Sequence, residues 1–273
     1  MPNPWVIGLL VTNEDRIKHA YDIVNYGREH EEYYSYMTDA ERNEYDTLFP
    51  RPIILDNVET VNYSGMRYTV VKWPESKYTK ENISNIKCKL FGFWGHSQGG
   101  TKLGKECLSQ WYIRDFVVNG VKYCCMEQYM MAQKAVYFGD TEIYHKIMNS
   151  DNPKDIKALG RKVRNFDSKA WDKVKRDIIL TGNYCKFSQN KDLREFLIHT
   201  TGCVLVEASP YDKIWGIGLR VTDPDFQNIK NWPGQNLLGF SLMQVRDEIS
   251  RVYQNYNLLD FGKCPDEFRD RLL

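Results

Sequence analysis

The feature that most constrains the fold is the octapeptide Phe116-Val-Val-Asn-Gly-Val-Lys-Tyr123. An Asn-Gly pair between two apolar runs is the preferred sequence of a type I′ turn, because both central residues of that turn need a positive φ. The octapeptide therefore predicts a β-hairpin. It leads directly into the apolar stretch 126–138, which Gly139 follows, and a glycine in that place is typical of a helix end. The chain is thus expected to pass from a strand pair straight into a helix.

Hydrophobic periodicity and capping residues predict further elements on both sides of this unit. The expected helices span residues 14–26, a segment that opens with a capping-box pattern at Thr38, 141–148, 154–163, 168–180 with Ser168 as N-cap, 191–199 and 237–253. Strands are expected at 67–72, 87–94 and 203–207, and a glycine-bearing loop at 212–218. Short strands among many helices indicate an α+β fold rather than a doubly wound sheet.

Length and composition limit the number of domains and the class of protein. The 273 residues fit one large domain or two small ones, and a boundary near residue 85 separates a less patterned N-terminal third from a more strongly punctuated remainder. With 42% hydrophobic and 27% charged residues, disordered and collagen-like chains are excluded. The aromatic share of 14% suits a ligand site built by stacking, although most of these rings are expected in the core.

Charge and cysteine content bear on partners and compartment. The 37 basic and 36 acidic side chains leave a net charge of +1, which provides no overall field to recruit nucleic acid or membrane. No apolar run is long enough for a membrane span, and the first residues do not resemble a signal peptide. Seven cysteines without a C-x-x-C spacing favour neither a disulfide framework nor a zinc site. We therefore expect a cytoplasmic protein with reduced thiols.

Two ionisable side chains on the expected 126–138 helix are candidates for chemistry. Glu127 lies in the first turn, where the helix dipole favours an ionised carboxylate and burial would raise the pKa of the carboxyl. The alternative is an exposed glutamate that the dipole stabilises. Lys134 lies two turns further along the same face of this largely apolar helix. Its amine could extend to water, or it could be desolvated and act as a nucleophile or phosphate ligand.

Other candidates are open to an ordinary structural explanation as well. The loop containing Asp212 and Trp215 can polarise a hydroxyl and stack on a ring, but Asp turns and Trp plugs are common in proteins. Core packing is the simpler interpretation of Trp171. His96 lies in a glycine-rich segment that matches neither the Walker nor the dinucleotide-binding pattern. Residues 154–186 hold ten basic and four acidic side chains, which could follow phosphates or form a solvated surface.

A set of short segments occurs in a recognisable order between residues 88 and 253. The segments are Glu127-Gln-Tyr-Met-Met-Ala-Gln-Lys-Ala135, Leu159-Gly-Arg161, Phe166 through Trp171, Lys186-Phe187, Leu205-Val-Glu-Ala208, Asp212-x-x-Trp-Gly216, and Gly234-x-Asn-x-Leu-Gly239 followed by Leu242-Met-x-x-Arg246. Together they resemble the NADAR/YbiA-like family. The resemblance implies a compact, mostly helical α+β fold with a small, mainly antiparallel sheet. It places the family domain in residues 86–273 and leaves residues 1–85 as an N-terminal extension, which could pack on that domain.

Members of this family are N-glycosidases that cleave a ribose–nitrogen bond, either in early riboflavin-pathway intermediates or in ADP-ribose attached to guanine. Some are paired with DNA-modifying ADP-ribosyltransferase toxins. The basic 154–186 segment and the N-terminal extension favour ADP-ribosylated guanine in DNA or RNA as substrate, over a ribosylaminopyrimidine phosphate. A non-catalytic module that binds ADP-ribose or nucleic acid is the second alternative. The resemblance implies no cofactor, metal or membrane partner, and it leaves the oligomeric state open.

Carried over position by position, the resemblance makes Glu127 the essential carboxylate and adds Lys134 and Asp212 as catalytic residues. The substrate-binding residues that it implies are Phe93, Trp94, His96, Ser109, Trp171, Trp215, Gly216 and Asn236. Cleavage passes through an oxocarbenium-like state, so Glu127 would supply charge beside ribose C1′ or activate the attacking water. Asp212 would hold ribose hydroxyls or serve as a second carboxylate. Whether Lys134 attacks C1′ and forms a Schiff base stays open.

Overall fold

The structure is a computed structural model, and it describes residues 39–40, 43, 50, 52–95 and 103–254. The expected helix at 14–26 lies outside the described residues. So does most of the helix expected from Thr38, of which only Asp39, Ala40 and Asn43 are described, all three as helical. Within these ranges no helix combines the length and the apolar character that a membrane span requires.

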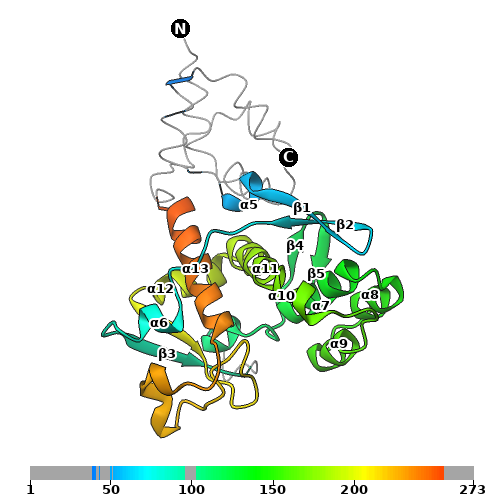
Figure 1. Ribbon diagram of the computed structural model, residues 1–273. Helices are drawn as coiled ribbons and strands as arrows, with labels where there is room; N and C mark the ends of the chain where they lie inside the picture. Colours follow the sequence, from blue (N-terminus) through cyan, green and yellow to red (C-terminus); the bar gives the residue numbers. More distant parts are fainter. Residues whose placement is uncertain (1–38, 41–42, 44–49, 51, 96–102, 255–273) are drawn as a thin grey trace.

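A buried helix, α11 (Lys175–Gln189), forms the centre of the molecule (Figure 1). All residues from Asp177 to Ser188 are buried, as expected of a helix enclosed by other elements. It packs against α7 (Met126–Tyr137), α12 (Lys191–His199) and α13 (Leu237–Val252). These elements lie at or within one residue of the positions predicted at 126–138, 191–199 and 237–253, so those three predictions are confirmed.

The predicted hairpin is confirmed and supplies the entry to α7. Strand β4 (Phe116–Val118) pairs with β5 (Val121–Tyr123), and the turn residues Asn119 and Gly120 have φ of 50° and 75°. Both angles are positive, as a type I′ turn requires. Only Cys124 and Cys125 separate β5 from α7, so the hairpin fixes where the first turn of that helix begins.

A parallel strand pair forms the other structural support of the site. Strand β3 (Lys89–Phe93) lies beside β6 (Cys203–Glu207), with Phe93 opposite Glu207 at the end of both strands. Because the strands are parallel, the segments that leave their carboxyl ends emerge at the same edge. Helix α13 packs on β6. The sequence predicted both strands but not their pairing.

The helices after α7 follow the predictions in part. Helix α8 (Thr141–Met148) has the predicted bounds, whereas α9 (Pro153–Gly160) ends before the expected Val163. The chain leaves α9 early because Arg164 turns back to Asp140. Its backbone N–H donates to Asp140 Oδ2 at 2.9 Å, and its guanidinium donates to both oxygens of that carboxylate.

The helix predicted at 168–180 with Ser168 as N-cap is wrong in its N-cap, in its continuity and in its C-terminal end. The structure has α10 (Ser168–Asp172) and a separate α11 that begins at Lys175, and Asp167 is the N-cap of α10. The Asp167 carboxylate accepts the N–H groups of Lys169 and Ala170, which have no acceptor within the helix. Helix α11 continues past Gly182. The absence of a side chain at Gly182 lets Tyr129 and Met126 of α7 pack directly against α11.

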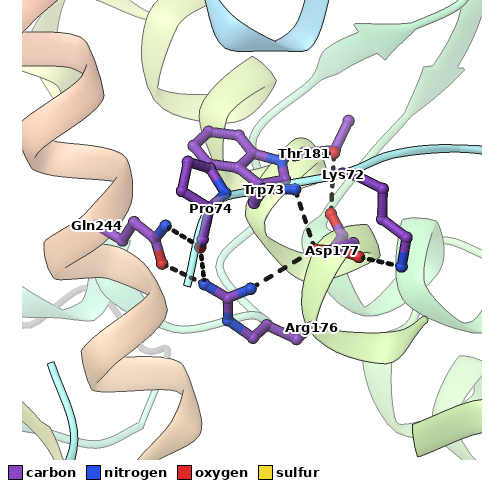
Figure 2. A network of polar contacts seen from close by, with 7 residues as sticks. All are labelled: Lys72, Trp73, Pro74, Arg176, Asp177, Thr181 and Gln244. Carbon is purple, nitrogen blue, oxygen red and sulfur yellow. Dashed lines mark hydrogen bonds and ion pairs between the residues drawn. The ribbon is translucent and has the colours of Figure 1, made fainter. Parts of the chain in front are cut away.

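Residues 52–83 lie on the surface of this helical body. They form α5 (Ile53–Asp56), β1 (Val58–Tyr63), β2 (Met66–Val71) and α6 (Lys80–Ile83), of which only β2 was predicted. After β2 the chain crosses α11, where Asp177 accepts Lys72 Nζ at 2.9 Å and Trp73 N at 3.2 Å (Figure 2). The Trp73 indole is buried and donates to Thr181 Oγ1.

The predicted α+β class is confirmed. The strands of the described residues form three separate pairs rather than one sheet, and β1–β2 and β4–β5 are antiparallel whereas β3–β6 is parallel. Three short 3₁₀ turns complete the described elements, at Lys105–Leu108, Pro224–Gln227 and Ile229–Asn231.

Candidate active site

A cavity of about 530 Å³ lies at the carboxyl edge of the β3–β6 pair. This volume is in the range of small-molecule sites. Six parts of the chain line it: the end of β3, the 109–111 segment, α7, the end of α9, the chain from the end of β6 to Trp215, and the start of α13. The lining residues are Trp94, Gly95, Ser109, Gln110, Trp111, Glu127, Met130, Met131, Lys134, Lys157, Gly160, Arg161, Glu207, Ser209, Tyr211, Asp212, Trp215 and Leu238.

Glu127 is the second residue of α7 and lines the cavity with a side chain that is only 2% exposed. Its backbone N–H donates to Gln110 O at 2.9 Å, and its Oε2 accepts the indole N–H of Trp111 at 3.2 Å. Its Oε1 has no hydrogen-bond partner among the described residues. Burial raises the pKa of Glu127 to about 7, and the negative charge of Asp212 acts in the same direction, against Lys157, Arg161 and the Trp111 hydrogen bond. A carboxyl with this pKa can give or accept a proton near neutral pH.

The segment that contains Trp111 is held in place by a buried lysine on α11, Lys186. Lys186 on α11 has no exposed surface, and its Nζ donates to Cys107 O at 2.7 Å and to Ser109 O at 3.1 Å. Ser109 Oγ in turn accepts the backbone N–H of Trp111. These bonds fix the backbone that presents the indole to Glu127. Lys186 is therefore a structural support of the site and not part of the cavity wall.

A second carboxyl, Glu207, lines the same cavity at the end of β6. Its side chain is 9% exposed, and burial raises the pKa of this carboxyl to about 8, with a further contribution from Asp212. Asp212 is half-buried in the loop that follows. Its Oδ1 accepts the N–H groups of Ile214 and Trp215, each at 2.8 Å, which fixes the loop and the Trp215 ring on it.

Cationic groups come from α7 and from the end of α9. Lys134 Nζ donates to Gly160 O at 2.9 Å and lies 3.9 Å from the centre of the Phe166 ring. Burial lowers the pKa of Lys134. Lys157 Nζ lies 5.6 Å from the centre of the Trp111 ring, and Arg161 follows one turn later at the C-terminus of α9. Gly160 is required here because a Cβ at that position would lie 1.8 Å from Met131 Sδ on α7.

Two aromatic rings stand at the rim of the cavity. Trp94 is 49% exposed and Tyr211 is 80% exposed, and their ring centres lie 6.1 Å apart. Exposed rings of this size at the edge of a cavity provide surface on which a flat ligand group can stack.

The structure brings together six of the residues expected in the site, and it places the others elsewhere. Trp94, Ser109, Glu127, Lys134, Asp212 and Trp215 line the cavity. Phe93 is fully buried beneath it, and Trp171 packs in the core against Tyr137 and Phe138. His96 lies outside the described residues.

Gly216 and Asn236 act on the backbone of the site rather than on its cavity wall. Asn236 is fully buried with a φ of 56°, and its side chain accepts Glu207 N–H at 3.0 Å and donates to Leu205 O at 2.9 Å. A Cβ on Gly216 would lie 2.8 Å from Glu207 O. Both residues therefore allow the loop to lie close against β6.

Among the lining residues that the expectation from sequence omitted are Trp111 as the donor to Glu127, the cations Lys157 and Arg161, and the buried carboxyl of Glu207. One signal was available for Glu207. It closes the apolar strand Cys203–Glu207, and an acidic residue at the inner end of a buried strand is unusual unless it serves a site.

The part of the chain that lines the cavity is similar in sequence to known proteins. The NADAR domain model matches residues 92–250. The chain is 46% identical over 158 residues to N-glycosidase R617 of Acanthamoeba polyphaga mimivirus, covering 56% of this chain and 93% of that protein. It is 34% identical over 146 residues to N-glycosidase Npun_R5314 of Nostoc punctiforme, covering 54% and 86%. The NMR structure of the E. coli protein YbiA aligns with a TM-score of 0.49 and 25% identity, covering 60% of this chain and 87% of that one.

Proposed function

The chain belongs to the NADAR domain family, and we propose that Glu127 is the catalytic carboxylate with which it hydrolyses an N-glycosyl bond. Relatives with 46% and 34% identity are named N-glycosidases, and the chain is accordingly a hydrolase that acts on N-glycosyl bonds.

The observation that carries the proposal is the unequal environment of the two Glu127 oxygens. Trp111 holds Oε2, whereas Oε1 has no partner among the described residues and belongs to a side chain that lines the cavity. A carboxylate held through one oxygen keeps the other for a water or for ribose C1′. As the C1′–N bond breaks, positive charge develops on the ribose, and a fixed carboxylate stabilises that charge more than it stabilises the ground state.

The remaining residues have roles that follow from their positions. Two backbone N–H groups donate to Oδ1 of Asp212 and hold the carboxylate in place. Its other oxygen, Oδ2, can then accept hydrogen bonds from ribose hydroxyls. Trp215 offers a ring for stacking. Lys134 has a lowered pKa and lines the cavity, so a route in which its amine attacks C1′ and the opened sugar forms a Schiff base is the variant to test by borohydride trapping.

We infer that the substrate is ADP-ribose attached to guanine in nucleic acid, the type of substrate that the family resemblance implies. Two features support a polymer over a free nucleotide. Lys157 and Arg161 place positive charge where phosphates would enter, and Trp94 and Tyr211 expose rings on which a neighbouring base can stack. A ribosylaminopyrimidine phosphate would use the cations but would leave the outer rings without a role.

We also propose that the chain is divided into an extension, residues 1–85, and a catalytic domain, residues 86–273. The bonds from Lys72 and Trp73 to Asp177, and from the Trp73 indole to Thr181, support packing of the extension on the catalytic domain (Figure 2). The family match to residues 92–250 begins after this segment.

The experiment incubates the protein with guanine-ADP-ribosylated DNA and, separately, with a ribosylaminopyrimidine phosphate, and follows both by mass spectrometry over a salt series. We expect release of ADP-ribose and unmodified guanine. The Michaelis constant for DNA should rise with salt by about 0.7 to 0.9 log units per log unit of salt for each phosphate contact. Cleavage of the pyrimidine phosphate alone would contradict the substrate but not the reaction. Binding of ADP-ribose with no cleavage of either substrate would favour a non-catalytic module.

A further inference from the structure

Glu207 is a buried acid in the catalytic cavity that the proposed reaction has not yet used. Its backbone is fixed on both sides, because its N–H donates to Asn236 Oδ1 at 3.0 Å and its carbonyl accepts Ile217 N–H at 3.0 Å. The residue also ends β6 opposite Phe93 in the parallel pair. The main chain is therefore fixed at the point where the Glu207 side chain leaves β6 beside the cavity.

The Glu207 carboxyl has no hydrogen bond and no ion pair with any residue in the described part of the chain, although its side chain is only 9% exposed. A buried polar group without a partner is costly, so such a group in a cavity is a candidate for contact with a ligand. By contrast, Oδ1 of Asp212 is held by two backbone N–H groups, and Oε2 of Glu127 is held by Trp111.

Burial keeps most of Glu207 neutral at physiological pH. Burial is the main cause that raises the pKa of Glu207 to about 8; the Asp212 carboxylate acts in the same direction, and Lys157 opposes both. Glu127 and Lys134 on α7 and Arg161 at the end of α9 line the same cavity, but none of them forms an ion pair with Glu207. Near pH 7 most of Glu207 is therefore a carboxylic acid that can donate a proton, while Glu127 with a pKa of about 7 is substantially ionised.

We propose that Glu207 is a second catalytic residue, the acid that gives its proton to the departing base while Glu127 takes a proton from the attacking water. This inference rests on the proposed N-glycosidase function and extends it. Two carboxyls with opposite tasks are the arrangement that hydrolysis of a glycosidic bond requires when the leaving group is poor.

The step balances without a further reactant. The C1′–N bond breaks and its electron pair stays on the base, which takes the proton from Glu207. The water oxygen bonds to C1′ and loses one proton to Glu127. The products are the unmodified guanine, which remains in the nucleic acid, and ADP-ribose with a hydroxyl at C1′. Exchange with solvent then returns a proton to Glu207 and removes one from Glu127, which restores both groups for the next turnover.

The test compares wild-type protein with Glu207→Gln, which keeps the size and a hydrogen-bond donor but has no proton to transfer. Glu195→Gln is the matched control, because Glu195 is an exposed glutamate on α12 that does not line the cavity. The measurement is kcat and KM from pH 5 to 9 on the ribosyl–nitrogen substrate that the wild-type protein cleaves. Circular dichroism establishes that each variant is folded.

We expect Glu207→Gln to lower kcat about a hundredfold, the usual loss for an acid–base group, with little change in KM. An acid must be protonated to act, so wild-type kcat should fall as the pH rises through the pKa of Glu207, and this alkaline limb should disappear in Glu207→Gln. Glu195→Gln should behave as wild type. If Glu207→Gln does not fold, Glu207→Asp serves instead, and it should lose kcat but keep the alkaline limb.

Three outcomes would overturn the inference: wild-type kcat in Glu207→Gln, a loss confined to KM, or an alkaline limb that survives in Glu207→Gln. Loss of the limb in Glu207→Asp would do the same. In each case an active wild-type protein leaves the proposed function standing. A wild-type protein that is inactive on both ribosyl–nitrogen substrates would instead contradict the proposed function, and the inference with it.

Discussion

The indole Nε1 of Trp111 lies 3.2 Å from Oε2 of Glu127 and donates a hydrogen bond to it. The two residues come from different segments, which the bond between Gln110 O and Glu127 N–H brings together. A hydrogen bond to the charged form of an acid favours that form, so Trp111 holds the pKa of Glu127 below the value that burial alone would set.

Removing this donor should therefore shift the pH dependence of the reaction. Trp111→Phe keeps a ring but loses the N–H, and the pKa of Glu127 should rise by about one unit, since a hydrogen bond to a charged group is worth about 1.5 kcal/mol or more. If Glu127 acts as a base, the acidic limb of the kcat profile should move to higher pH. An acidic limb that stays at its wild-type position would separate Trp111 from the ionisation of Glu127.

The two tryptophans expected in the site should respond differently to truncation. Trp215 lines the cavity, so Trp215→Ala should raise KM about tenfold, in line with about 1–3 kcal/mol for stacking on one base. Trp171 packs against Tyr137 and Phe138, so Trp171→Ala should cost about 3–5 kcal/mol of unfolding free energy. Urea unfolding and steady-state kinetics on both variants make the comparison. A loss of about 3 kcal/mol or more in Trp215→Ala with an unchanged KM would place that ring in the core instead.

The buried carboxyls should make the protein less stable as the pH rises. The pKa values of Glu127 and Glu207 are about 7 and about 8 in the folded state, against 4.5 for an ordinary glutamate. Between these limits the folded state binds more protons than the unfolded state, so the free energy of unfolding falls with increasing pH. Glu127→Gln should be more stable than wild type at pH 8 by on the order of 1–3 kcal/mol, and no more stable at pH 4.5. The same pH dependence in both proteins, measured by urea unfolding, would contradict the burial argument.

The contact between residues 72–74 and α11 should contribute to the free energy of unfolding of the protein. Asp177 is 6% exposed and accepts Lys72 Nζ and Trp73 N–H (Figure 2). Asp177→Ala should lower the unfolding free energy by about 1–3 kcal/mol, because the buried Trp73 N–H loses its acceptor. Asp172→Ala is the matched control on the neighbouring helix. The Asp172 side chain is 59% exposed where it pairs with Lys175, so this ion pair should contribute less than about 1 kcal/mol. Equal losses in the two variants would mean that Asp177 does not anchor this segment.

Local features of the fold were predictable from sequence, and features set by packing were not. The Asn119-Gly120 turn and α7 follow from the residues themselves, because a positive φ and an apolar face are local requirements. The break between α10 and α11 was missed because the apolar pattern continues across it. The second half of α11 was missed because a glycine, here Gly182, is typical of a helix end. Strand β1 was missed because its outer face is exposed and only its pairing with β2 identifies it.

The same distinction applies to the site. Glu127 was identifiable because it follows the hairpin at a helix start, and Asp212 and Trp215 because they share a loop. Trp111, Lys157, Arg161 and Glu207 lie on three separate parts of the chain: the 109–111 segment, the end of α9 and the end of β6. Only the parallel pairing of β3 with β6 and the packing of α9 on α7 bring them to one cavity, and neither can be derived from local patterns.

The most direct test of the account is the turnover of Glu127→Gln on the ribosyl–nitrogen substrate that the wild-type protein cleaves, with Glu195→Gln as control. The substitution keeps the side chain's size and an acceptor for the Trp111 indole, but it removes the charge and the ability to take a proton. The account predicts a folded protein whose kcat is at least about a hundredfold below that of wild type and of Glu195→Gln. A folded Glu127→Gln with near-wild-type kcat would contradict it.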